Sequence, residues 1–335
     1  MIAHDRVRVS EGAYPVEGEE LSTTMSFAGR TAVISGGGRG LGRTYALEMA
    51  HRGASIVIND PGSTVTGTGS AAAAEEVVAE IQTLGGHAVA SRAAVSDQAS
   101  AIQVIDTAVE EFGSCDIVIN SAGILRDRTF ENMSEDEYEA VMQGHATGPF
   151  FLTQAAFRQM KVQGYGRVVF TSSAAGLFGN FGQSNYALAK NGIVGLTKVL
   201  ALEGARHGIL VNAVAPVAAT RMAAQGLTAG LPEAMDPHLV TPLVLYLASE
   251  ASTHTMKTFS AGGGHFAEVF VSESRGWTSD GIVQPEDVAA HMPLITSRDE
   301  PLEFGNAFEE IAHVCREARI PNPYGDLTVP EAVDG

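Results

Sequence analysis

Short runs of apolar residues recur along the chain, and most of them end at a glycine or a polar residue. Because polar positions do not alternate within these runs, they predict strands that are buried on both faces, as in a parallel sheet. The runs cover residues 31–35, 54–59, 88–90, 116–120, 167–170 and 209–214.

Segments with helical spacing of apolar positions lie between and after those runs. They cover residues 44–52, 70–84, 98–112, 134–159, 185–207 and 242–248. Strand and helix therefore alternate through about residue 250. This alternation predicts a single α/β domain built on a doubly wound parallel sheet, the Rossmann fold.

The two ends of the chain differ from this pattern. Residues 1–25 are polar and predict an irregular leader, so the Rossmann-type domain is expected over residues 26–270. Residues 271–335 are richer in proline and acidic residues and are expected to form an extension packed on the domain. Gln284 and Pro285 predict the start of a helix within it.

Composition narrows the class of protein. The formal net charge of −18 argues against a surface for nucleic acids or anionic membranes. The two cysteines, Cys115 and Cys315, are far apart, so we expect neither a disulfide framework nor a metal site. The first residues lack the apolar run of a signal peptide, and no stretch reaches the roughly 18–20 apolar residues of a membrane span. We therefore expect a cytoplasmic protein without membrane insertion.

A glycine-rich stretch, residues 35–42, follows the first predicted strand and opens the first helix. Glycines let the backbone approach a pyrophosphate, and a helix N-terminus offers free N–H groups to it. In this position the stretch predicts a dinucleotide site. The residues assigned to cofactor binding are Gly36, Arg39, Gly40, Leu41 and Gly42.

Asp60 ends the second predicted strand, about twenty residues after Gly40, where a carboxylate can accept hydrogen bonds from both ribose hydroxyls. Because it would repel a 2′-phosphate, the sequence favours NAD over NADP. Arg39 points the other way, since a guanidinium there can reach a 2′-phosphate. The alternative is that Asp60 only caps the turn with Pro61 and Gly62.

Asn120, Ala122 and Gly123 end the fourth predicted strand, near the point where open α/β sheets bind ligands. Small residues there would let the ribose and the nicotinamide half of a dinucleotide pass over the sheet edge. An ordinary turn at the end of a strand is the alternative.

Tyr186 and Lys190 stand four residues apart on one face of an apolar helix. A nearby ammonium is expected to lower the pKa of the phenol, so that it exchanges a proton with an alcohol or a ketone. Ser173, after the fifth predicted strand, supplies a hydroxyl for the substrate oxygen. Ser172 is the neighbouring alternative, and either serine can instead cap a turn.

These motifs, with the strand exit at residues 212–216, resemble the short-chain dehydrogenase/reductase family over residues 28–265. The resemblance implies an NAD(P)-dependent enzyme acting on CH–OH groups, with Ser173, Tyr186 and Lys190 as catalytic residues. It also places Tyr186 and Lys190 against the cofactor, with Thr220 on the nicotinamide carboxamide. The other cofactor contacts that it implies are Val95, Pro216 and Val217.

Two positions depart from that family. His145 stands where the family usually has an asparagine that holds a proton-relay water, so we assign His145 to the catalytic set. A histidine that only packs the helix is the alternative. The aspartate that often precedes Val95 and contacts adenine is replaced by Ala94.

Residues 59–62, 122–128 and 179–186 are similar to the (3R)-hydroxyacyl-CoA dehydrogenase domains of peroxisomal multifunctional enzymes type 2. This narrower resemblance implies NAD-dependent oxidation of a (3R)-3-hydroxyacyl-CoA to the 3-oxoacyl-CoA. A 17β-hydroxysteroid or another secondary alcohol is the alternative substrate. A catalytically silent dinucleotide-binding scaffold is a third possibility, which the intact catalytic residues argue against.

The narrower resemblance also extends to residues 283–288 of the extension, and the length of 335 residues predicts a stand-alone dehydrogenase. Residues 218–240 are expected to line the substrate cleft; the alternative is that their apolar side chains serve the core or an oligomer contact. These side chains are Met222, Leu227, Leu231 and Met235. The family implies a homo-oligomer, a dimer or a tetramer, formed through the long helices at 134–159 and 185–207.

Overall fold

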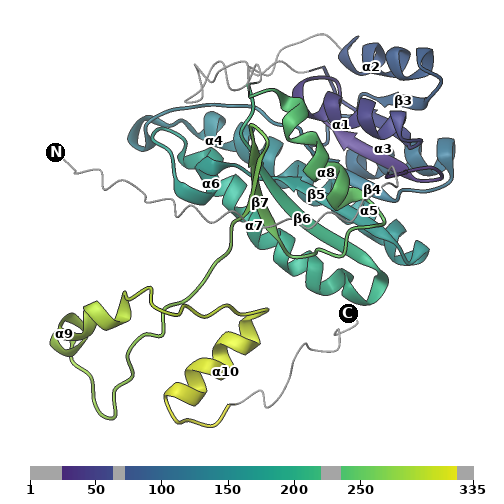
Figure 1. The fold of residues 1–335 in the computed structure, drawn as a ribbon. Coiled ribbons are helices and arrows are strands. Elements are labelled where there is room, and N and C mark those ends of the chain that lie inside the picture. Colours follow the sequence, from purple (N-terminus) through teal and green to yellow (C-terminus); the bar gives the residue numbers. More distant parts are fainter. Residues whose placement is uncertain (1–24, 63–71, 220–234, 323–335) are drawn as a thin grey trace.

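The computed structural model describes residues 25–62, 72–219 and 235–322. Its centre is an eight-stranded sheet in the order β3-β2-β1-β4-β5-β6-β7-β8 (Figure 1). Strands β1 to β7 are parallel, and β8 is antiparallel to β7. The strands are β1 Thr31–Ser35, β2 Ser55–Asn59, β3 His87–Ser91, β4 Ile117–Asn120, β5 Gly166–Thr171, β6 Ile209–Pro216, β7 Thr258–Gly262 and β8 His265–Glu268.

Helices cover both faces of this sheet, as the apolar strands predicted. The main ones are α1 Gly40–His51, α2 Ala72–Thr83, α3 Gln98–Phe112, α4 Glu135–Met142, α5 Gly148–Gln163, α6 Ala174–Phe178, α7 Ser184–Gly204, α8 Thr241–Ala248, α9 Pro285–Ile295 and α10 Ala307–Glu317. Shorter turns are the helices η1 Phe130–Asn132, η2 Gln143–Thr147, η3 Ala205–His207 and η5 Pro237–Leu239. The doubly wound fold is thereby confirmed.

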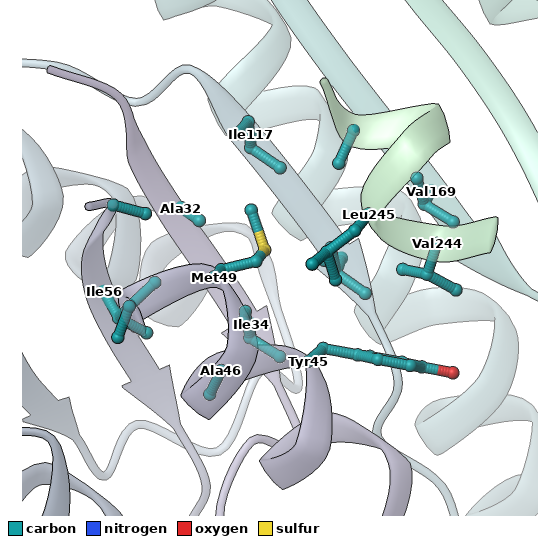
Figure 2. Packing of buried hydrophobic residues seen from close by; sticks show 14 of the residues in the cluster. Ala32, Ile34, Tyr45, Ala46, Met49, Ile56, Ile117, Val169, Val244 and Leu245 are labelled. Carbon is teal, nitrogen blue, oxygen red and sulfur yellow. The ribbon is translucent and has the colours of Figure 1, made fainter. Parts of the chain in front are cut away.

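Successive strand residues point into two separate cores. Ile34 faces the cluster built with α1, α2 and α8, whereas Val33 faces the cluster built with α3, α5 and α7. Figure 2 shows Met49 of α1 among Ala32, Ile117 and Leu245 in the first cluster. Because the side chains on both faces of the sheet are buried, truncating a large one in either cluster to alanine should lower the free energy of unfolding by about 2–5 kcal/mol.

One predicted helix is divided in the structure. Residues 134–159 were expected to form a continuous helix, but α4 ends at Met142 and α5 begins at Gly148. Between them the chain makes one turn of π-helix, Gln143–Thr147. Hydrophobic spacing cannot reveal such a turn, because a π-turn keeps the helical direction while shifting the side chains that follow it.

The sheet also continues past residue 250, where the expected alternation ended. β7 and β8 escaped prediction because they lack an apolar run: β7 reads Thr-Phe-Ser-Ala-Gly, and β8 has no buried side chain. β8 is the edge strand of the sheet, which explains its lack of buried side chains, since an edge strand is covered on fewer sides than a central one.

The extension begins after β8, and Figure 1 shows α9 and α10 away from the sheet domain. Its backbone is ordered by contacts within itself, such as the paired hydrogen bonds between Glu273 and Leu302. No side chain of α9 is buried, and Cys315 is the buried side chain of α10. In the described residues of a single chain, the expected packing of this extension on the domain is therefore not observed, although the helix start at Pro285 is. None of the helices in the described part of the chain has the length and hydropathy to cross a bilayer.

Candidate active site

Tyr186, Lys190 and Ser173 meet at the carboxyl edge of the sheet. Tyr186 lies in the first turn of α7, and Lys190 follows one turn later, with its Nζ 5.7 Å from the centre of the Tyr186 ring. Ser173 follows β5 and hydrogen-bonds the Tyr186 phenol. The i, i+4 spacing and the end of β5 thus bring together the three side chains that the sequence singled out.

The structure separates the two candidate serines. The Ser172 hydroxyl is buried and donates to the carbonyl oxygen of Lys190 at 2.9 Å. The Ser173 oxygen accepts from the N–H of Ala175 at 3.2 Å and faces Tyr186. Ser172 therefore supports α7, and the geometry favours Ser173 as the hydroxyl that meets a substrate oxygen.

Burial decides the electrostatics of the pair. It raises the pKa of the Tyr186 phenol; the hydrogen bond from Ser173 lowers that pKa in part, and the charge of Asp127 raises it further. Burial also lowers the pKa of the Lys190 ammonium to about 7. The Lys190 Nζ donates to the carbonyl oxygen of Thr171 at 2.6 Å.

This result corrects the sequence-based expectation that Lys190 lowers the pKa of Tyr186. A lysine whose own pKa is about 7 is only partly charged at neutral pH, so its effect on the phenol is weak. Desolvation was not visible in the sequence, because it depends on the helices that enclose the pair.

His145 lies in the π-turn between α4 and α5, 1% exposed. Its ring stands edge-on to the Tyr186 ring, with the centroids 4.8 Å apart. Nε2 faces both backbone polar groups of Ile124: the N–H lies 3.0 Å away and the carbonyl oxygen 2.7 Å away. Nδ1 is buried and has no hydrogen-bond partner among the described residues. Burial and then the charge of Lys190 hold the pKa of His145 well below its ordinary value, so the ring is neutral.

The glycine loop packs directly against the end of β4. Gly36 has a φ of +67°, and a Cβ there would stand 2.7 Å from both Cα and N of Ala122. A Cβ on Gly42 would stand 2.3 Å from the Gly36 carbonyl oxygen. These clashes leave no room for side chains, and the loop forms the bare backbone cradle that a pyrophosphate needs. Gly40 and Leu41 open α1 beside it, and Arg39 precedes them without a side-chain cap bond.

Asp60 caps the turn that follows β2, and its carboxylate also contacts the glycine loop. Its Oδ1 accepts from the N–H of Gly62 at 2.8 Å, which caps the turn. Its Oδ2 accepts from the N–H of Gly38 at 3.1 Å, which holds the carboxylate against the glycine loop. The turn and the ribose position are therefore compatible, because capping brings the carboxylate to the cofactor cradle.

The other predicted cofactor residues lie along the same edge. Asn120 donates from Nδ2 to the Thr153 hydroxyl at 3.0 Å, while its buried Oδ1 has no partner in the described structure. The Val95 carbonyl oxygen packs against Gly148 at the start of α5. Val217 follows Pro216, and its N–H donates to the carbonyl oxygen of Ala261 at 2.8 Å. An unpaired buried amide oxygen and a cradle without side chains fit a dinucleotide.

Some predicted residues lie outside the described residues. They are Thr220 on the carboxamide and Met222, Leu227 and Leu231 of the expected cleft. Met235 is described, and its sulfur lies 3.0 Å from where a Cβ on Gly263 would be. Its place in a substrate cleft stays a prediction.

The structure adds residues to which the sequence analysis gave no role. A cavity of about 690 Å³ opens in the segment that follows β4. It is lined by Asp127, Arg128, Thr129, Asn132, Ser134 and Glu137. Arg128 donates to Glu137 at 2.7 Å and holds the pKa of that carboxyl at about 2. Asp127 and Arg128 fall in the stretch 122–128 that the narrower resemblance singles out, and this is the signal that pointed to the region.

Comparisons with known proteins agree with this geometry. A family model described as short chain dehydrogenase matches residues 30–230. A short-chain type dehydrogenase/reductase of Mycobacterium tuberculosis is 45% identical over 268 residues, which are 80% of this chain and 94% of that protein. Hydroxyacyl-CoA dehydrogenase ChsB1 of Mycobacterium tuberculosis is 39% identical over 245 residues, which are 69% of this chain and 76% of that protein.

A multifunctional enzyme is also among the relatives. Peroxisomal multifunctional enzyme type 2 of Drosophila melanogaster is 44% identical over 253 residues, which are 75% of this chain and 42% of that protein. Its full-length structure superposes with a TM-score of 0.74 at 32% identity, covering 88% of this chain and 50% of that one. This chain therefore spans less than half the length of that relative.

Proposed function

The chain belongs to the short-chain dehydrogenase/reductase family, as predicted, and is an NAD(P)-dependent dehydrogenase acting on CH–OH groups; we propose that it oxidises a (3R)-3-hydroxyacyl-CoA to the 3-oxoacyl-CoA with NAD. The observation that supports the chemistry is the convergence of Ser173, Tyr186 and Lys190 at the sheet edge. The substrate class rests on the likeness to ChsB1 and to the multifunctional enzyme.

In this proposal the chain's own residues handle the proton. The Ser173 hydroxyl donates a hydrogen bond to the substrate oxygen as negative charge develops on it. Tyr186 takes the proton of the substrate hydroxyl while its own phenolic proton moves toward Lys190 and the C3–H hydride leaves, so the alcohol becomes a ketone. Bound NAD would supply the hydride acceptor.

Lys190 and His145 complete the proposed site. Lys190 accepts that proton in its neutral form and passes it toward solvent, which a pKa of about 7 suits at neutral pH. Nδ1 of His145, which has no partner in the described structure, is the ring nitrogen that takes a hydrogen bond in that proton path, in the position where the family usually has an asparagine. The glycine loop and Asp60 would hold the cofactor, and the Asp60 carboxylate favours NAD over NADP.

A substrate panel tests the choice of substrate. Initial rates are measured with 3-hydroxyacyl-CoA thioesters of both C3 configurations and with a 17β-hydroxysteroid, each with NAD and with NADP. We expect the highest kcat/KM with a (3R)-hydroxyacyl-CoA and NAD. A strong steroid rate without an acyl-CoA rate would overturn the proposed substrate and leave the reaction class standing.

A single substitution tests the chemistry. Tyr186→Phe should keep NAD binding but lower kcat by about 100-fold or more, because general acid–base catalysis contributes 10²–10⁴-fold. Tyr138→Phe, on a tyrosine that is 41% exposed in α4, is the matched control and should keep full activity. Retained turnover in Tyr186→Phe would show that another group moves the proton.

A further inference from the structure

Asn185, the residue directly before Tyr186, is 1% exposed and makes three hydrogen bonds through its side chain. Its Nδ2 donates to the carbonyl oxygens of Arg126 and Glu137, both at 3.1 Å. Its Oδ1 accepts from the backbone N–H of Tyr186 at 2.7 Å. Both amide hydrogens and the amide oxygen are thus engaged, which leaves this buried group satisfied.

These bonds join α7 to two segments that lie about 50–60 positions earlier in the chain. Arg126 lies after β4, Glu137 lies in α4, and Tyr186 lies in α7. Further contacts hold the first segment to the start of α7. The Arg128 N–H donates to Gly182 at 2.8 Å, and Gln183 Nε2 donates to both carboxylate oxygens of Asp127 at 3.0 Å.

The backbone N–H of Tyr186 lies in the first turn of α7, where N–H groups lack partners within the helix. The first N–H groups of a helix have no partner within it, and the Gln183 N-cap of α7 provides no side-chain cap bond. Asn185 supplies that missing bond at Tyr186 itself. The position of the phenol relative to Ser173 and His145 therefore depends on an amide that reaches back to the loop after β4.

We propose that Asn185 is a positioning residue for the reaction: its amide fixes the first turn of α7 to the segment after β4 and to α4, and thereby holds the Tyr186 phenol in place. The inference rests on the proposed proton transfer by Tyr186. The role requires a side chain that donates two hydrogen bonds, because two carbonyl oxygens face Nδ2 of Asn185.

Two substitutions isolate this donation. Asn185→Asp keeps the size of the side chain but places a carboxylate oxygen against two carbonyls, and Asn185→Ser is neutral and too short to bridge them. Asn191→Asp makes the same chemical change on an exposed residue of α7 and is the matched control. For each variant we would measure thermal unfolding, Kd for NAD, kcat and KM for the alcohol, and the pH profile of kcat.

We expect both Asn185 variants to bind NAD as the wild type does and to lose kcat by about 100-fold, the loss that a misplacement of roughly 1 Å produces. The apparent pKa in the kcat profile should also shift, because the phenol leaves Ser173, and Asn191→Asp should match the wild type. A folded Asn185→Ser variant with kcat within about threefold of the wild type and an unchanged profile would overturn the proposal. Failure of Asn185→Ser to fold would overturn it too, since Asn185 would then serve the fold. Activity retained by Tyr186→Phe would instead refute the proposed function.

Discussion

His145 lies directly against Gly123: a Cβ on residue 123 would stand 2.0 Å from Cε1 of the imidazole and 2.8 Å from Nε2. Gly123, in the segment after β4, thus makes room for the His145 ring, which stands edge-on to Tyr186. The proposed cofactor edge and the proposed proton-transfer site are therefore packed against each other through this contact.

Gly123→Ala should push His145 away from Tyr186. Forcing a methyl group into a filled site costs about 1–3 kcal/mol, and we expect both the free energy of unfolding and kcat to fall. In a His145→Ala background the same change should cost much less, because the obstructing ring is gone. A double-mutant cycle on unfolding free energy measures this coupling.

Gly144→Ala is the control for that cycle. A Cβ on Gly144 would make only an ordinary contact, 3.7 Å from Ile124 Cγ1, so this change should leave activity near the wild-type level. Equal costs of Gly123→Ala with and without the His145 ring would contradict the predicted coupling.

Asp60→Asn should weaken the preference for NAD. The carboxylate that faces the glycine loop would lose its charge, and with it the repulsion of a 2′-phosphate and the charged hydrogen bonds to a ribose. Because such a bond contributes about 1.5–3 kcal/mol, the NAD-to-NADP ratio of kcat/KM should fall at least about tenfold. Asp106→Asn, on an exposed residue of α3, should leave that ratio unchanged. The prediction fails if Asp60→Asn behaves like the control.

Lys190 should make stability depend on pH above neutrality. Its pKa is about 7 in the folded protein, whereas a lysine exposed to water, as in the unfolded chain, has a pKa of 10.5. Between these two pH values the unfolded chain therefore binds more protons than the folded one. Stability therefore rises with pH across this window, and below about pH 7 the effect is constant.

Lys190→Met removes that dependence. The stability of the wild type relative to Lys190→Met should increase from pH 7 to pH 9 by on the order of 2 kcal/mol. Urea unfolding of the cofactor-free protein at several pH values measures this difference. A constant difference across the range would mean that Lys190 keeps its ordinary pKa in the fold.

Helix α7 presents an exposed face that suits the expected oligomer. Leu188 and Val199 are 55% and 51% exposed, and Gly192 and Gly195 lie between them on the same side of the helix. We predict a light-scattering mass of two or four times 35.0 kDa. Leu188→Glu combined with Val199→Glu should give the mass of one chain, because charges would be buried in the contact.

Leu84→Glu is the matched control for this prediction. Leu84 is 76% exposed directly after α2, so the same apolar-to-charged change there should leave the mass unchanged. A wild-type mass near 35.0 kDa would refute the oligomer.

The sequence by itself determined the layers of the fold and the residue types of the site. Uniformly apolar runs such as residues 31–35 are buried on both faces only in a sheet covered by helices on both sides. The glycine loop was recognisable because bare backbone is needed at a fixed place between strand and helix. The four-residue spacing of Tyr186 and Lys190 follows from helix geometry alone. Each of these features is local, so a short window of sequence contains it.

Tertiary structure alone decided the relationships between distant segments. The π-turn turned His145 toward Tyr186, and packing against α7 took Ser172 out of the site and left Ser173 in it. Burial reversed the expected direction of the Tyr186 pKa, because desolvation depends on every element that encloses the phenol. Asn185 gained its role from carbonyl groups about 50–60 positions away in the chain. No periodicity encodes such contacts, since they arise only when the folded backbone brings the segments together.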